Sequence, residues 1–125
     1  MTIEELKDIA QQKVKPRQLS ESCYVASVAS ALITDKGTVY TGVCIDTACS
    51  MGFCAEHAAI AQMITNEESR IMKIVAVGRN GKILPPCGRC REFIYQINNK
   101  NLEAEVLVGE NKVVKLEELL PYRFE

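Results

Sequence analysis

Two short cysteine segments constrain this chain more than any other feature of its sequence. They are Cys54-Ala55-Glu56 and Pro86-Cys87-Gly88-Arg89-Cys90. Their three cysteines can bind one Zn²⁺ ion and leave its fourth tetrahedral position to water, which is typical of a catalytic rather than a structural zinc site. A fold that uses both segments must bring two distant parts of the chain to one point.

Size and charge limit the class of protein. The 125 residues suit a single domain, residues 1–125, and the 15 basic and 16 acidic side chains give a formal charge of −1. No strongly basic face for a nucleic-acid polymer is expected, so a small nucleoside or nucleobase is the predicted ligand. No apolar run is long enough for a membrane span, and the acidic start Met1–Glu5 does not resemble a signal peptide. We expect a cytoplasmic protein, whose grouped cysteines serve a metal rather than disulfides.

Apolar and β-branched segments alternate with helical patterns through most of the chain. The predicted strands cover residues 24–33, 38–45, 71–77, 105–108 and 113–114. Two helices are predicted to begin at residues 2 and 54, and two more to cover residues 88–98 and 116–120. The first two strands are expected to form a hairpin, and the later ones to be joined by parallel crossovers. The sequence therefore predicts a mixed five-stranded sheet in a three-layer α/β/α sandwich.

Both cysteine segments fall where a loop enters a predicted helix. The partial positive charge of a helix N-terminus lowers thiol pKa values and stabilises thiolates. Three thiolates would still leave the zinc site with a formal charge of −1, so nearby cations are expected. His57 and Arg91, beside Glu56 and Cys90, are predicted to supply them without binding the metal, and neutralising Arg91 should weaken catalysis more than folding.

The order of these motifs is that of the zinc nucleobase deaminases. Those enzymes carry a His/Cys-x-Glu element followed by Pro-Cys-x-x-Cys, with a glutamate that moves protons but does not bind metal. This chain fits the version with three cysteine ligands, Cys54, Cys87 and Cys90. Glu56 is then the predicted catalytic residue, which deprotonates water and protonates the ring and the leaving amine.

Three other interpretations remain open at this point. His57 could complete a closed Cys₃His site, which would make the protein a structural-zinc interaction module. A deaminase acting on RNA or DNA is disfavoured by the charge balance and would show salt-dependent binding. A thiol-disulfide enzyme would use Cys87 and Cys90 but would leave Cys54 and Glu56 unexplained.

Nearly the whole chain resembles the small, single-domain cytidine deaminase family, and especially its blasticidin-S deaminase branch. Beyond the cysteine motifs, the similarity rests on residues 27–32, 41–43, 86–91 and the ending 116–124. The resemblance implies one Zn²⁺ per subunit, a homotetramer, and a substrate contact from Ala55. It also implies that Phe124 reaches a neighbouring subunit's base pocket, although an apolar anchor for the tail is an equal alternative.

The sequence departs from that family where substrate is bound. Cytidine deaminases carry an Asn-x-Glu pair that binds ribose hydroxyls, and the matching stretch here is Cys44-Ile45-Asp46. Cysteine is a poor hydrogen-bonding substitute for asparagine, so specificity should be relaxed or shifted. Cytidine, deoxycytidine, blasticidin S and another aminated base all remain candidates, in nucleoside salvage or antibiotic detoxification.

Overall fold

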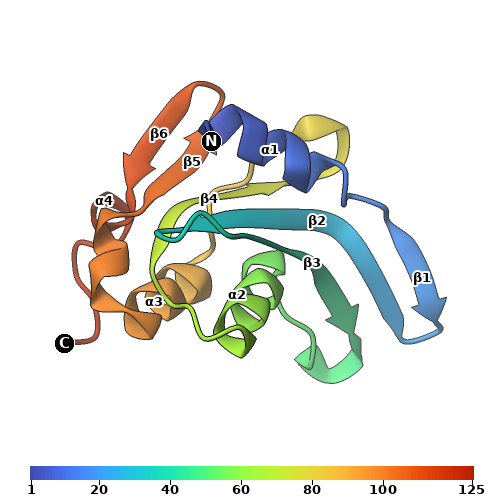
Figure 1. Cartoon of the computed structure of the whole chain (residues 1–125). Coiled ribbons are helices and arrows are strands. Elements are labelled where there is room, and N and C mark those ends of the chain that lie inside the picture. Colours follow the sequence, from blue (N-terminus) through green and yellow to red (C-terminus); the bar gives the residue numbers. More distant parts are fainter.

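The computed structural model describes all 125 residues, and its helices and strands alternate along most of the chain (Figure 1). The α-helices are α1 (Ile3–Gln11), α2 (Ala55–Thr65), α3 (Gly88–Ile97) and α4 (Leu116–Leu119). The strands are β1 (Arg17–Ser20), β2 (Cys23–Thr34), β3 (Val39–Thr47), β4 (Ile71–Val77), β5 (Glu105–Gly109) and β6 (Lys112–Lys115). None of the helices has the length and apolar character that a membrane crossing requires.

One mixed sheet contains all the strands, and the long strand β2 organises it. β2 pairs antiparallel with β3 along one edge, which confirms the predicted hairpin. Along its other edge it pairs with β1 near its start and with β4 near its end, both antiparallel. β4 and β5 are parallel and are joined through α3, and β6 closes the sheet antiparallel to β5.

The sheet has six strands, so the predicted number of five is wrong. The additional strand is β1, whose four residues are all exposed. A strand without a buried face has no alternation of apolar and polar residues, and this alternation is the signal by which strands are recognised in a sequence. Backbone pairing with the first residues of β2, such as Arg17 with Val25, holds it in place.

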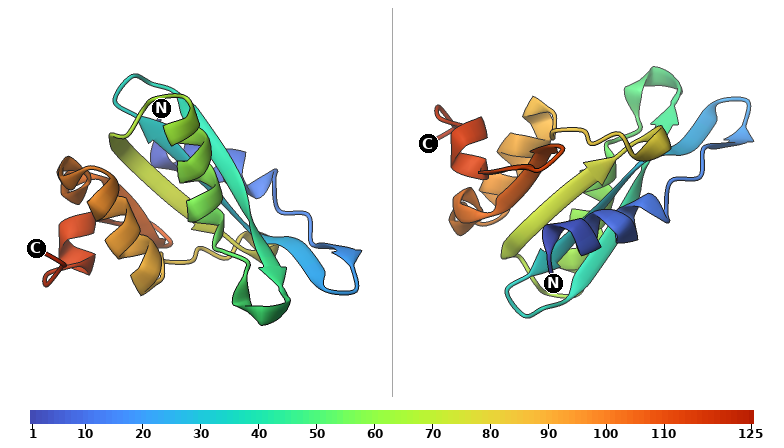
Figure 2. Two further views of the ribbon diagram at one scale, coloured as in Figure 1. Left: turned by 90° about the horizontal axis from the view of Figure 1, so that it is seen from below. Right: turned by 90° about the horizontal axis from the view of Figure 1, so that it is seen from above.

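Helices cover both faces of the sheet, which confirms the three-layer arrangement (Figure 2). α1 lies on one face, where Leu6 and Ala10 pack against Ala31, Val75 and other sheet residues. α2 and α3 lie side by side on the opposite face, over the larger of the two apolar cores. The starts of α2 and α3 carry the two cysteine segments, so the layering places both segments on the same side of the sheet.

Close packing between α2 and β3 fixes the start of α2. A Cβ atom built on Gly42 of β3 would lie 2.4 Å from the backbone nitrogen of Ala59 and 2.6 Å from the Cβ of Ala58. Such an approach is possible only where one partner is glycine and the other is a small residue. The alanine-rich α2 therefore sits directly on β3, and Cys54 at its start is held against the sheet.

Candidate metal centre

The three predicted cysteine ligands all lie at helix starts. Cys54 is the N-cap residue of α2, Cys87 is the N-cap residue of α3, and Cys90 lies in the first turn of α3. Neither N-cap cysteine uses its side chain to cap its helix. Each thiol is therefore available for another role.

The structure brings the three sulfur atoms together. The Sγ atoms of Cys54 and Cys87 are 3.6 Å apart, and those of Cys87 and Cys90 are also 3.6 Å apart. The sulfurs of Cys54 and Cys90 lie within 4.8 Å of each other. Zn–S bonds of about 2.3 Å with tetrahedral angles would separate two ligand sulfurs by about 3.8 Å. The donor set and its spacing therefore fit a zinc ion.

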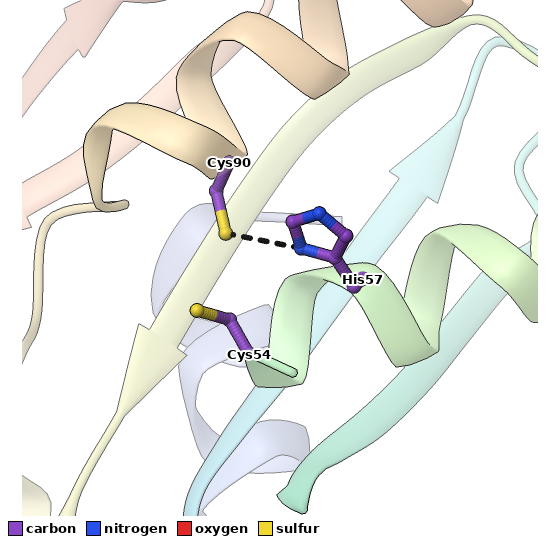
Figure 3. A group of neighbouring side chains, drawn as sticks. All are labelled: Cys54, His57 and Cys90. Atoms are coloured by element: carbon purple, nitrogen blue, oxygen red, sulfur yellow. Dashed lines mark hydrogen bonds between the residues drawn. The ribbon is translucent and has the colours of Figure 1, made fainter. Parts of the chain in front are cut away.

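His57 approaches the same point from α2. Its Nδ1 atom lies 3.3 Å from the Sγ atom of Cys90, and the ligand atoms of Cys54, His57 and Cys90 all lie within 4.8 Å of one another (Figure 3). Its ring stacks on Phe93 of α3 with centroids 4.3 Å apart and planes only 3° from parallel. His57 is thus held in place beside Cys90, where it can either bind a metal or donate a hydrogen bond to a thiolate.

Burial and helix geometry give the three thiols different pKa values. Burial, followed by the neighbouring thiols and the Glu56 carboxylate, raises the pKa values of Cys54 and Cys90 above the usual range. Burial also raises the pKa of Cys87, but hydrogen bonds from the Cys90 backbone N–H, the Cys90 and Cys54 thiols and the Arg89 N–H together outweigh it and lower that pKa. Two of the three thiols would therefore need a cation to become thiolates, which is the role of a bound metal.

The side chain of Glu56 is almost fully buried beside these sulfurs, with an exposed fraction of 5%. Burial raises its pKa, and its own backbone N–H and the Cys90 thiol offset only part of the effect. Burial also lowers the pKa of His57, as does the positive charge of Arg89. The site thus contains a carboxyl group that takes up a proton more readily than usual, and an imidazole that takes one up less readily.

A cavity of about 600 Å³ adjoins the sulfurs. Among the residues predicted for the site, it is lined by Cys44, Asp46, Cys54, Ala55, Glu56 and Cys87. Phe124 does not line it and has an exposed fraction of 70%. A second, more open hollow of about 710 Å³ near the end of α1 is lined by no acidic, cysteine or histidine side chain, so the chemistry belongs to the first cavity.

A β-bulge shapes the part of the cavity wall around Cys44. Ala26 of β2 has a φ of 64°, and the pairing of β2 with β3 is interrupted between Val25 and Ala29. The interruption turns the Ser27 hydroxyl and the Val28 N–H toward Cys44, and each lies 3.3 Å from its Sγ atom. The Cys44 sulfur is therefore already occupied by β2, and its thiol also lies 3.9 Å from Oδ2 of Asp46, so the Oδ1 atom of Asp46 is the freer acceptor.

The sequence interpretation missed part of this wall. The cavity is also lined by five residues that the sequence analysis does not assign to the site: Ser27, Thr47, Ser50, Phe53 and Arg89. Ser50 and Gly52, in the loop after β3, reach it because the backbones of Ile45 and Phe53 pair with each other and fold this loop back. The glycine and serine content of residues 50–52 indicates a loop but not which way it folds back.

Arg91, predicted to offset the charge of the thiolates, makes two hydrogen bonds to the backbone. Its guanidinium donates hydrogen bonds to the backbone oxygens of Pro86 and Leu119, at 2.8 and 3.2 Å. Arg89 is the arginine that lines the cavity beside Cys87. A charge-balancing role for Arg91 remains a prediction, and its contacts indicate that it also holds the backbone.

Comparison with known proteins agrees with this geometry. The sequence profile of the cytidine and deoxycytidylate deaminase zinc-binding region matches residues 2–105. Cytidine deaminase from Mycobacterium tuberculosis is 29% identical over 77 residues, which cover 61% of this chain and 58% of that protein. The chain thus spans just over half the length of this relative. Cytidine deaminase from Sporosarcina psychrophila is 27% identical over 124 residues, which cover 94% of this chain and 91% of that protein.

Solved structures give the same result for the fold. The crystal structure of cytidine deaminase from Mycobacterium leprae has a TM-score of 0.81 and 25% identity, with 98% of this chain and 99% of that chain covered. Cytidine deaminase from Mycobacterium tuberculosis has a TM-score of 0.83 and 24% identity, with 100% and 98% covered. The similarity therefore includes every layer of the sandwich.

Proposed function

The chain belongs to the cytidine and deoxycytidylate deaminase family, and we propose that it is a zinc-dependent hydrolase of a cytosine-type nucleoside. The reaction replaces the amino group at C4 of the ring with oxygen from water and releases ammonia. The observation that carries the proposal is the meeting of three cysteine sulfurs with the buried Glu56 at one end of a cavity large enough for a nucleoside.

Cys54, Cys87 and Cys90 are the proposed ligands of one zinc ion per chain. When bound, zinc would supply the Lewis acidity that makes water a nucleophile at neutral pH. The backbone N–H groups at the start of α3 support this assignment, because they stabilise negative charge on the Cys87 sulfur. The Cys87 sulfur lies 3.6 Å from the sulfurs of both Cys54 and Cys90, close to the separation of two zinc ligands, which favours the three-cysteine set over one that includes His57.

Glu56 is the proposed proton carrier. It takes a proton from the attacking water and passes it to N3 of the ring, and then moves the remaining proton of the C4 hydroxyl to the leaving amine as the C4–N bond breaks. Its burial raises its pKa, so the carboxyl group can hold a proton between these transfers. Glu56 lines the cavity together with Cys54 and Cys87, which supports a contact of its carboxyl group with both water and ring.

His57 is proposed to donate its Nδ1 hydrogen to the Cys90 thiolate. The 3.3 Å separation and the stacking on Phe93 favour a fixed hydrogen bond that offsets part of the thiolate charge. The competing role is a fourth ligand, which would close the site and make the protein a structural-zinc module. The proximity of His57 to Cys54 and Cys90 favours that second candidate, and the zinc measurement below separates the two.

Asp46 and Ala55 are the proposed substrate contacts, and Cys44 lines the same cavity. Asp46 can accept a hydrogen bond from a sugar hydroxyl, while Cys44 is engaged by Ser27 and Val28. Cytidine and deoxycytidine are the first candidates, consistent with pyrimidine salvage. A compound like blasticidin S, which carries a modified sugar, is the second, because the Asn-x-Glu pattern is absent.

A homotetramer is proposed for the assembly. The side chain of Phe124 extends from the end of the chain and does not reach the chain's own cavity, so it is available to a neighbouring one. Cytoplasmic location remains a prediction, supported by six cysteines that are all free thiols.

The test is ammonia release by the purified protein from cytidine, deoxycytidine, cytosine, blasticidin S and aminated purines, with zinc content measured in parallel. Glu56→Gln should retain zinc and lose turnover by about 100-fold or more. A variant as active as the parent would remove Glu56 from the mechanism. Zinc that no water or substrate analogue can reach, and that His57→Ala releases, would support the structural-zinc alternative.

A further inference from the structure

α3 carries metal-binding cysteines at its first turn and holds the end of the chain along its length (Figures 1 and 2). Glu92 accepts a hydrogen bond from the backbone N–H of Phe124 at 3.2 Å, and the Tyr95 hydroxyl donates to the backbone oxygen of Glu125 at 2.9 Å. The Arg123 guanidinium lies over the Tyr95 ring, 5.6 Å from its centroid. The last residues of the chain are therefore docked on the helix that begins at the metal site.

Arg91 connects these two functions of α3 directly. Its Nε atom donates to the oxygen of Pro86, the residue before Cys87, and its Nη1 atom donates to the oxygen of Leu119, the last residue of α4. Its backbone N–H donates to the oxygen of Cys87 at 3.0 Å. One half-buried side chain thus bridges the cysteine loop, residues 85–90, and the C-terminal segment, residues 116–125.

The cysteine loop depends on such a contact because of its prolines. Pro85 and Pro86 have no backbone N–H, so this stretch can be fixed only through its carbonyl groups and side chains. The end of α4 likewise presents carbonyl groups that no helical N–H can reach. A planar guanidinium offers two donors in a fixed fork, which suits two carbonyls from different segments.

We infer that Arg91 is a positioning residue that couples zinc binding at Cys87 and Cys90 to docking of residues 116–125. This inference rests on the zinc binding of the proposed function. If the cysteine loop is ordered by zinc, the Pro86 carbonyl holds Arg91 in the orientation that binds Leu119. Conversely, a docked C-terminal segment holds the loop in its metal-binding shape, as reciprocity of coupling requires.

The experiment measures both sites in the same variants. Zinc release into excess chelator is followed by absorbance, and amide hydrogen exchange of residues 116–125 is followed by mass spectrometry with and without zinc. In the parent protein, removing zinc should raise exchange in residues 116–125. Arg91→Met should release zinc about tenfold faster or more. It should also show raised exchange in that segment whether or not zinc is bound.

Arg91→Lys should give zinc release and amide exchange between those of the parent and Arg91→Met, because a single ammonium group cannot reach both carbonyls in a fixed geometry. Arg79→Met is the matched control, since Arg79 donates to the Tyr24 hydroxyl and contacts neither segment. Glu92→Gln weakens the docking of residues 116–125 on α3 and leaves the contacts of the cysteine loop unchanged. It should therefore speed zinc release less than Arg91→Met does.

The inference is overturned if zinc leaves exchange in residues 116–125 unchanged in the parent, or if Arg91→Met releases zinc at the parent rate. A parent protein that binds no zinc at all would instead contradict the proposed function. The bridge itself would still be tested in that case, by comparing exchange of residues 85–90 and 116–125 in Arg91→Met and the parent. If Arg91→Met does not fold, Arg91→Lys carries both measurements.

Discussion

The two ends of the cavity are built in different ways. At the metal end, Cys54, Cys87 and Cys90 are placed by two helix starts, and each position follows from a few neighbouring residues. At the opposite end, Cys44 and Asp46 acquire their surroundings from a bulge in another strand and from a loop that folds back. The reaction is thus encoded in short motifs, whereas substrate choice depends on how distant segments pair.

The largest effect is expected at the metal end. Cys54→Ser or Cys90→Ala should lose zinc and all measurable deaminase activity, because two thiolates bind the ion too weakly to hold it. A chelator should do the same to the parent protein, and added zinc should restore the parent but not the variants. Zinc content and ammonia release are the measurements.

Cys49→Ser is the control for these variants, because Cys49 is an exposed thiol that does not line the cavity. It should retain both zinc and activity. Full activity in Cys54→Ser would contradict the ligand assignment.

The second prediction concerns the imidazole beside the metal end. If His57 donates a hydrogen bond to the Cys90 thiolate, His57→Ala should keep its zinc but release it about 10- to 100-fold faster. His57→Gln can still donate and should recover part of the loss. Phe93→Leu, which removes the stacked ring, should resemble a mild form of His57→Ala. Loss of zinc from His57→Ala during purification would instead identify His57 as a ligand.

The metal end was predictable because its information is local. A cysteine at a helix start, a glutamate two residues later and a Cys-x-x-Cys pair within one helical turn keep their relative positions in any fold that forms those helices. Naming Arg91 as a cation for the thiolates goes beyond that information. Sequence adjacency to Cys90 does not say toward which side of α3 a long side chain extends, and Arg91 extends toward Pro86 and Leu119.

The opposite end could not be predicted in the same way. The bulge at Ala26 lies within an apolar run whose pattern predicts a regular strand. The positive φ falls on an alanine rather than a glycine, so the residue type does not indicate it. β1 has no buried face, and its pairing follows from the register of β2 rather than from its own residues. Both features arise from long-range backbone pairing, which a single sequence does not display.

A smaller effect is expected at this end of the cavity. Asp46→Ala should raise KM for cytidine roughly tenfold with less change in kcat, because a hydrogen bond to a charged group is lost from substrate binding. The KM of Asp46→Ala for free cytosine, which lacks a sugar, should differ little from that of the parent. Equal loss with cytidine and cytosine would mean that Asp46 acts on the fold or the base rather than on the sugar.

Cys44→Asn tests whether the bulge or the side chain sets specificity. Asparagine restores the family pattern, but the Ser27 hydroxyl and Val28 N–H now occupied by the Cys44 sulfur would compete for its oxygen. We therefore expect cytidine turnover to improve only when Ser27→Ala is added. Improvement from Cys44→Asn alone would show that the bulge has little influence.

The smallest effect lies away from both ends, where Glu68 joins β2 and β3 to the loop after α2. Its carboxylate accepts hydrogen bonds from the hydroxyls of Thr34 and Tyr40, at 2.6 and 2.5 Å. The bond from Thr34, followed by the bond from Tyr40, lowers the pKa of Glu68. In the unfolded chain Glu68 binds a proton at higher pH than in the folded protein. The folded state therefore loses this stabilisation as the pH falls from the usual glutamate pKa through the lowered one.

Glu68→Gln should be less stable than the parent at neutral pH, and the difference should shrink as the pH is lowered, because the parent alone loses the stabilisation. Urea unfolding at several values between about pH 7 and about pH 3 measures it. Glu110→Gln, at an exposed turn, is the control and should change neither stability nor its pH dependence. Zinc content and KM for cytidine should stay at parent values. A change in either would mean that the Glu68 hydrogen bonds influence the cavity. The two ends of the cavity would then be less independent than their construction implies.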